Sequence, residues 1–180
     1  PAVVAAAERV VFPGQGAMPD CMRELDARGL RPAVLAAAQD KPFLGICLGL
    51  QALYDFSEEG GGTPCLSLLA GAVKRFPVEK MTDQATGLPL KVPHMGWNQV
   101  HQTSTHPLWN GIRQDTRFYF VHSYYADSAD APDIAGETTY ALRFTSAAAH
   151  ANVFAVQFHP EKSQRAGLRL PENFMSWNGN

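Results

Sequence analysis

The chain has 180 residues, the length of one domain of ordinary size, and a formal net charge of only −2 at pH 7. Charged residues make up 18% of it and the basic ones are scattered, so bulk charge gives no reason to expect binding to nucleic acid or to a membrane. Three cysteines without paired spacing argue against a disulfide framework and favour a reducing compartment, the cytoplasm by default.

The first part of the chain alternates between helical and strand patterns. Pro19 and Pro32 each stand where a helix begins, because proline is tolerated in a first turn. In chain order we expect a helix at 2–7, a strand at 10–12, helices at 19–29 and 33–39, a strand ending before Cys47, and a helix at 48–56.

After a glycine-rich loop at 58–64, short strands separated by turns replace this alternation. We expect strands at 73–76, 90–92, 99–101, 117–120 and 139–144, a buried strand at 153–158, and a closing helix at 162–177 that Pro171 interrupts. The pattern predicts one α/β domain over 1–180, with three layers, a mostly parallel central sheet and a small antiparallel annex.

The most informative segment is Gly45-Ile46-Cys47-Leu48-Gly49, on the predicted turn from strand to helix. A G-x-C-x-G at such a turn is the thiol form of a nucleophile elbow. We expect the two glycines to allow a tight turn and the helix dipole to favour the Cys47 thiolate. The alternative is a buried cysteine that acts only as a small apolar side chain.

A second candidate segment, His159-Pro160-Glu161, follows the predicted strand 153–158. Alternation along an extended chain puts His159 and Glu161 on the same side, where the carboxylate can orient the imidazole. Both Cys47 and His159 follow strands, at the edge where open α/β sheets place their sites. We therefore expect a Cys47 sulfur near one His159 nitrogen, and Glu161 about 3 Å from the other.

Other polar segments give weaker signals. The loop Pro13-Gly14-Gln15-Gly16 lacks the Lys-Ser/Thr of a phosphate-binding loop. His101 and His106 have finger-like spacing but no cysteine pair beside them, so we expect neither a metal nor a cofactor. Trp97 is either a core residue or an exposed anchor for a partner, and its polar neighbours favour the second reading.

Segments 45–51 and 157–163 resemble the two signatures of the class I (triad) glutamine amidotransferase family, and the resemblance runs from about residue 9 to 177. Within that family, segments 12–18, 93–98 and 118–124 are similar to the glutaminase subunits of imidazole glycerol phosphate synthases. The resemblance implies a flavodoxin-like fold.

It also implies roles for individual residues. Cys47 would be the nucleophile, His159 the general base and acid, and Glu161 its orienting partner. The oxyanion hole would use the backbone N–H of Leu48 and one from Gly14, Gln15 or Gly16. Gln51, Ser123 and Tyr124 would bind substrate, and the residues facing a partner would be His94, Met95, Gly96, Trp97 and Asn98.

The activity implied is hydrolysis of L-glutamine to glutamate and ammonia through a cysteine glutamyl thioester. The ammonia would pass to a (β/α)8-barrel cyclase subunit, in a heterodimer that makes imidazole glycerol phosphate for histidine biosynthesis. Two alternatives stay open: the glutaminase component of another synthase, of aminobenzoate, purine or cobalamin type, and a non-catalytic paralogue that serves as a binding module.

Three features depart from the family pattern. The family opens with a strand–helix unit that we do not find here, so we expect the domain to lack its first βα unit. Gln15 stands where a small apolar residue is frequent, and Ser67 where glycine is usual. Because Gln15 belongs to the loop expected to supply an oxyanion donor, the sequence does not fix the geometry of that donor.

Overall fold

The computed structural model describes residues 1–83, 86–129 and 131–180. The α-helices are α1 (Ala2–Ala6), α2 (Met18–Ala27), α3 (Arg31–Asp40), α4 (Leu48–Gln51) and α5 (Gln164–Ser176). The strands are β1 (Val10–Gly14), β2 (Phe43–Cys47), β3 (Phe56–Ser57), β4 (Thr63–Pro64), β5 (Gly71–Arg75), β6 (His94–Gln102), β7 (Thr116–His122), β8 (Tyr124–Ser128), β9 (Ile134–Tyr140), β10 (Leu142–His150) and β11 (Val153–Val156).

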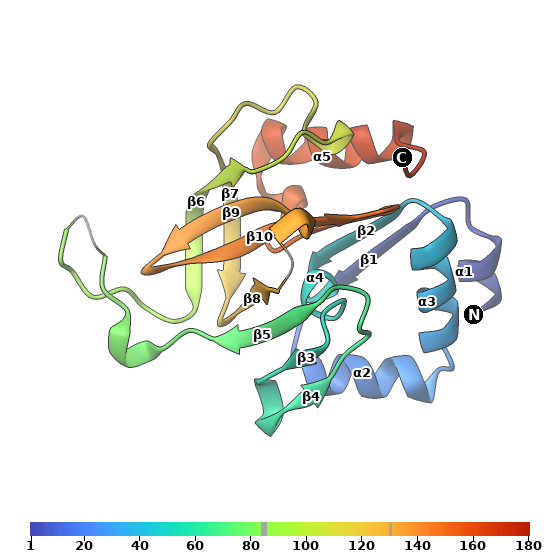
Figure 1. Ribbon diagram of the computed structural model, residues 1–180, viewed down its shortest axis with the longest axis horizontal. Helices are drawn as coiled ribbons and strands as arrows, with labels where there is room; N and C mark the ends of the chain where they lie inside the picture. Colours follow the sequence, from blue (N-terminus) through green and yellow to red (C-terminus); the bar gives the residue numbers. More distant parts are fainter. Residues whose placement is uncertain (84–85, 130) are drawn as a thin grey trace.

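The sheet has a parallel part and an antiparallel part. β2 lies between β1 and β11 and is parallel to both, with Phe43 opposite Val10 on one side and Val153 on the other. Beyond β11 the order continues β10-β8-β5-β3-β4, with β9 on β10 and the β6–β7 pair attached through β9. Figure 1 shows these antiparallel strands curling away from β1 and β2.

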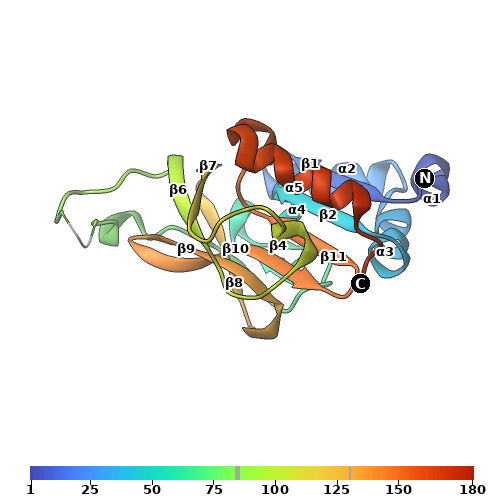
Figure 2. The same ribbon diagram turned by 90° about the horizontal axis from the view of Figure 1, so that it is seen from above.

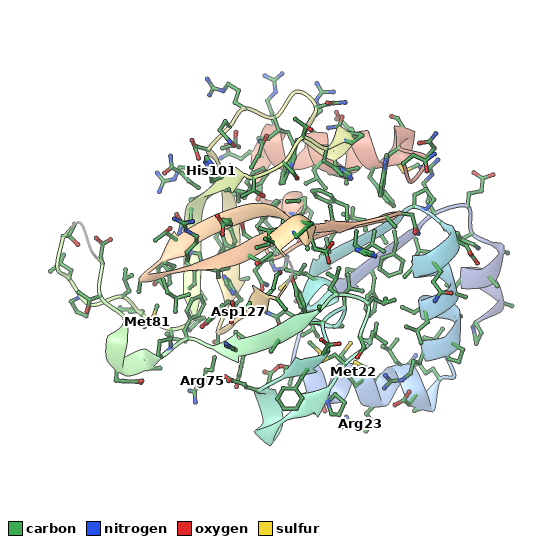
Figure 3. The ribbon with its side chains drawn as sticks, in the orientation of Figure 1. Met22, Arg23, Arg75, Met81, His101 and Asp127 are labelled. Carbon is green, nitrogen blue, oxygen red and sulfur yellow. The ribbon has the colours of Figure 1, made fainter. Side chains whose placement is uncertain are left out.

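Two hydrophobic cores cover opposite faces of the parallel part. Successive side chains of a strand point to opposite faces, so Phe43 joins the core under α2 and α3 while Leu44 joins the core under α5. Figure 1 shows α5 on one side of β1 and β2 and α2 on the other; in Figure 2 the helices gather over this part of the sheet, away from β6 and β9. Figure 3 labels one buried methionine of each core, Met22 on α2 and Met81 beyond β5.

The predicted fold class is confirmed, because helices lie on both faces of a mixed α/β sheet. Its antiparallel part is larger than predicted: β5, β6, β7, β8, β9 and β10 all pair antiparallel to a neighbour. The predicted strand 139–144 was wrong, since it runs across the β9–β10 turn, where Ala141 has φ of 60°. Segment 90–92 is also not a strand.

The predicted helix 48–56 ends at Gln51. Beyond it, the N–H groups of Leu53 and Tyr54 bond carbonyls three residues back, and Phe56 then pairs with Ala72 as part of β3. The reason is tertiary: from Asp55, whose N–H bonds the Gly71 carbonyl, the chain runs along β5 and cannot also continue as a helix. Conversely, α5 runs through Pro171 without a break, contrary to expectation.

None of the helices within the described residues is long and apolar enough to cross a membrane.

Candidate active site

The turn from β2 to α4 holds Cys47 in a strained conformation, with φ of 56° and ψ of −109°. A non-glycine residue there costs on the order of 1–3 kcal/mol, a cost that is common at functional sites. Neither glycine of the motif has a positive φ; what they permit is close approach. A Cβ on Gly49 would lie 1.8 Å from the Phe12 carbonyl oxygen, and one on Gly45 would lie 2.9 Å from the Ala155 Cβ. The elbow therefore packs directly on β1 and β11.

The Cys47 thiol is protonated in this conformation. Burial raises its pKa to about 11, against smaller lowering effects from hydrogen bonds with the Leu48 N–H and the Gln157 side chain. The negative charge of Glu161 raises it further and Lys162 lowers it. The expected stabilisation of the thiolate at the helix N-terminus is present in the hydrogen bond from the Leu48 N–H, but desolvation of the thiol outweighs it. A base must take the proton when Cys47 reacts.

His159 is oriented by three contacts. Its Nδ1 lies 2.7 Å from Glu161 Oε1, so the Nδ1–H donates a hydrogen bond to the carboxylate, and in the neutral ring Nε2 carries the lone pair. Its backbone N–H bonds the Tyr119 carbonyl at 2.9 Å, and its carbonyl accepts from Ser163 Oγ at 2.6 Å. The Nε2 atom is buried and has no hydrogen-bond partner among the described residues. It is a free acceptor, not yet bonded to Cys47.

Cys47 and His159 line one cavity of about 340 Å³. The residues around it come from β2, α4, β7 and β8 and from loops outside these elements: Gln15, Gly16, Cys47, Leu48, Gln51, Glu59, Pro93, Val121, His122, Ser123, Tyr124, His159 and Lys162. The expected nucleophile, base and substrate-binding residues thus share one space. Among the residues that the structure describes, no three His, Cys, Asp or Glu side chains gather as metal ligands would.

The side chain of Gln51 is fixed by its amide nitrogen. Nε2 donates to the Tyr124 carbonyl at 2.9 Å and to Gln157 Oε1 at 2.8 Å. Both of its hydrogens are therefore engaged, and its carbonyl oxygen is the polar atom left for a ligand. The Tyr124 carbonyl also accepts from His122 Nδ1, so it holds protein side chains and has no role as a free acceptor for substrate.

The loop before α2 contributes unequally to the expected oxyanion hole. Gln15 and Gly16 line the cavity, and Gly16 has φ of 96°. Gly14 does not line it; Gly14 pairs with Cys47 in the β1–β2 ladder, and a Cβ there would lie 2.8 Å from the Leu48 Cβ. Gly14 therefore acts through packing against the elbow.

The expected partner-facing segment forms the start of β6, where burial alternates along the strand. Met95 and Trp97 are 61% and 40% exposed, whereas His94 is only 3% exposed. The prediction for His94 was therefore wrong, because its side chain points inward. Asn98 is half-buried and bonds the Thr139 carbonyl, and Gly96 stands between the two exposed side chains with φ of 138°.

Sequence reasoning missed several residues of the site. Gln157 donates to Cys47 Sγ at 3.7 Å, and Glu59 lines the cavity while accepting from the Met18 N–H at 2.7 Å. Lys162 also lines it. Gln157 could have been found, since it is a polar residue in an otherwise apolar buried strand pattern. Glu59 lies in a glycine-rich loop and gave no signal.

Comparisons with known proteins agree with the chemistry of this site. The family model for class I glutamine amidotransferases matches residues 4–176. The chain is 64% identical over 177 residues to "Imidazole glycerol phosphate synthase subunit HisH" of Aromatoleum aromaticum, covering 98% of this chain and 82% of the relative. It is also 64% identical to the protein of the same name from Dechloromonas aromatica, covering 98% and 81%.

Solved structures share the fold at low sequence identity. A glutamine amidotransferase from Thermotoga maritima aligns with a TM-score of 0.56 at 19% identity, over 94% of this chain and 63% of its own. The glutaminase domain of Trypanosoma brucei CTPS, with bound acivicin, aligns with a TM-score of 0.58 at 14% identity, over 98% and 74%. Taken with the closer relatives, these findings show that the chain belongs to the class I glutamine amidotransferase family and, within it, to the HisH subunits of imidazole glycerol phosphate synthase.

Proposed function

We propose that this chain hydrolyses L-glutamine with Cys47 as nucleophile, and supplies the ammonia to a cyclase subunit that makes imidazole glycerol phosphate for histidine biosynthesis. The observation that carries the proposal is the pairing of a strained Cys47 with a buried, unbonded His159 Nε2 in one cavity. A thiol with a raised pKa needs a base beside it, and a carboxylate-oriented imidazole is suited to that task.

The steps follow from the positions of the protons. His159 Nε2 takes the thiol proton as sulfur attacks the side-chain amide carbon of glutamine. The imidazolium, stabilised by Glu161 at Nδ1, returns that proton to the departing nitrogen, so ammonia leaves and a glutamyl thioester remains. A water that gives its proton to His159 then hydrolyses the thioester to glutamate and free thiol. This chain needs no cofactor for these steps.

Backbone N–H groups would stabilise the oxyanion in both steps. In this structure the Leu48 N–H is directed at the Cys47 sulfur, so it lies beside the reacting atoms. The second donor would come from the Gly14-Gln15-Gly16 loop, where a peptide flanked by glycine rotates at little steric cost. We propose that this loop is the switch by which a partner turns the site on, since one lost donor costs about 100- to 1,000-fold in rate.

The partner would be a (β/α)8-barrel cyclase in a heterodimer. Free ammonia is protonated in neutral water and loses its nucleophilicity, so a synthase gains by passing it directly between subunits. Exposed Met95 and Trp97 on β6 supply apolar contact area for such a partner, beside a cavity of about 450 Å³ lined by 94–98 and 139–141. The free cysteines Cys21, Cys47 and Cys65 are typical of a reducing compartment, and we propose the cytoplasm.

The test is steady-state glutamate release from this protein, alone and with the saturating cyclase and its ligand. We expect slow release alone and a rise of at least about 100-fold in the complex. Equal rates would contradict the gated loop and favour a free-standing glutaminase. The absence of glutamate release in both conditions, together with intact ammonia-dependent synthesis by the partner, would contradict the function itself.

A further inference from the structure

We propose that His94, His122 and Gln157 are positioning residues for Cys47, joined in one chain of hydrogen bonds that starts at Asn98 on β6. The proposal rests on the glutaminase function above and deepens it, by stating how the inward face of β6 is connected to the nucleophile. Of the three, Gln157 bonds Cys47 directly, and the two histidines act through the hydrogen bonds that lead to it.

The histidine half of the chain has defined tautomers. His122 Nδ1 lies 2.7 Å from the Tyr124 carbonyl oxygen, which can only accept, so Nδ1 carries the proton. His122 Nε2 lies 2.9 Å from His94 Nδ1. Burial lowers the pKa of His122 to about 3 and that of His94 to about 4, so both rings are neutral near pH 7. His122 Nε2 is therefore an acceptor, and the His94 Nδ1–H donates to it.

Asn98 completes this half at the other ring nitrogen. His94 Nε2 has a lone pair and lies 3.3 Å from Asn98 Nδ2, whose second hydrogen goes to the Thr139 carbonyl at 2.9 Å. Asn98 Oδ1 accepts from the Gln99 N–H. Each group therefore has one orientation, and each depends on the next.

The glutamine half starts from the same carbonyl. Tyr124 O accepts a second bond, from Gln51 Nε2, whose other hydrogen goes to Gln157 Oε1. This turns the Gln157 NH₂ toward Cys47 Sγ, 3.7 Å away. A flipped Gln157 amide would set NH₂ against NH₂ at Gln51. Gln157 is fully buried and Gln51 is 4% exposed, so neither can turn to water instead.

This series of hydrogen bonds orients side chains and does not carry protons, because its two halves meet at the Tyr124 carbonyl, which accepts from both. Its effect is to hold an N–H donor beside the sulfur, where it stabilises the thiolate that forms during attack. Along β6, His94 and Asn98 point inward while Met95 and Trp97 point outward. A partner that displaces β6 therefore changes the Asn98–His94 and His94–His122 hydrogen bonds. This couples the outward face of β6 to the hydrogen bonds on its inward face.

The experiment uses the complex with its cyclase. His94→Phe keeps a ring between Phe120 and Tyr140, which stack on His94 with centroids 4.8 and 4.0 Å away, but removes both ring nitrogens. Gln157→Met removes the amide at similar length. Each should lower glutamine-dependent kcat/KM by roughly tenfold, the effect of one hydrogen bond of ordinary strength, with ammonia-dependent synthesis unchanged.

Two readouts separate positioning from general damage. In the double variant, kcat/KM for glutamine should fall much less than the roughly 100-fold product of the single losses, because both substitutions break the same series of hydrogen bonds. His94→Asn, which restores an N–H donor near the Nδ1 position, should recover part of the activity. The pH profile of Cys47 alkylation by iodoacetamide, followed by peptide mass spectrometry, should move to higher pH in Gln157→Met and in His94→Phe.

His106→Phe is the matched control. The pKa of His106 is also lowered by burial, but His106 packs against Phe154 and Trp177 and takes no part in the hydrogen bonds from Asn98 to Cys47. It should cost stability and leave both readouts unchanged. Multiplicative losses in the double variant, or equal behaviour of His94→Phe and His106→Phe, would overturn the proposal. The alkylation profile needs no glutamine, so it tests the chain of bonds even where glutamine hydrolysis itself is absent.

Discussion

The parallel and antiparallel parts of the sheet contribute different things to the site. The parallel part supplies the reacting groups: Cys47 ends β2, and His159 follows β11, at the carboxyl edge where such sheets place their sites. The antiparallel part supplies hydrogen bonds that aim them, through the carbonyls of Tyr119 and Tyr124 and the ring of His122. The antiparallel part thus adds orienting hydrogen bonds to those that Glu161 and Ser163, just after β11, make with His159.

The two parts also differ in how they are held. The elbow is fixed by close packing, because Gly49 lies so near β1 that a Cβ would not fit between them. The antiparallel side is fixed by a buried polar network in which each member is satisfied by the next. Packing tolerates few changes of volume, whereas a polar network tolerates few changes of donor or acceptor, so the two regions should respond to different substitutions.

The largest effect is expected from Cys47→Ala. Removing the nucleophile should lower glutamine-dependent synthesis by at least about 10⁴-fold, while ammonia-dependent synthesis by the cyclase continues, because that step needs only ammonia. Both activities are measured in the purified complex. Glutamine-dependent turnover that survives would mean that the reacting group does not come from the parallel part.

Gly49→Ala should show how strictly packing holds the elbow. Its Cβ would lie 1.8 Å from the Phe12 carbonyl oxygen, so the backbone must move, at an expected cost of about 4 kcal/mol in the free energy of unfolding. Gly61→Ala is the control: its Cβ would meet nothing within 4 Å, and only its φ of 81° is unfavourable, at about 1–2 kcal/mol. Urea denaturation gives both values, and equal losses would contradict packing as the cause.

Glu161→Gln should be milder than loss of the nucleophile. The amide still reaches His159 Nδ1 but no longer stabilises the imidazolium, so kcat for glutamine should fall about 100-fold with the fold intact. Circular dichroism and ammonia-dependent synthesis serve as controls. An unchanged kcat would remove Glu161 from the mechanism.

The smallest effect is a pH dependence of stability from the antiparallel part. The pKa of His94 is lowered from 6.5 to about 4, so below pH 6.5 the unfolded chain takes up a proton that the folded protein does not. The contribution of this residue to the free energy of unfolding should therefore be fully present above pH 6.5 and fall by about 2 kcal/mol between pH 6.5 and 5. Urea denaturation at several pH values should show that His94→Phe reduces the dependence by this amount, while the shares of His106 and His122, whose pKa values burial also lowers, remain.

Much of the parallel part could be predicted from the sequence. The apolar runs, the prolines at helix starts and the glycines around Cys47 indicate β1, α2, α3 and β2 within a few residues. The spacing of His159 and Glu161 predicts their contact, which is 2.7 Å where about 3 Å was expected. These are local signals, carried by residues close together in the chain.

What could not be predicted depends on distant partners. The bond between His94 and His122 exists because β6 and β7 pair in the one register that sets these residues opposite each other. The end of α4 at Gln51 follows from the pairing of the next segment with β5, and the raised pKa of Cys47 follows from the burial of its thiol. None of these is visible before the segments are assembled.

Labelling by a glutamine-mimicking electrophile tests the central claim most directly, which is that Cys47 is the nucleophile in a site built for glutamine. The complex would be treated with 6-diazo-5-oxo-L-norleucine and the modified peptide identified by mass spectrometry, with and without excess glutamine. We expect one adduct, on Cys47, whose formation glutamine suppresses, while Cys21 and Cys65 stay unmodified. Labelling of either of these cysteines, or labelling of Cys47 that glutamine does not slow, would contradict it.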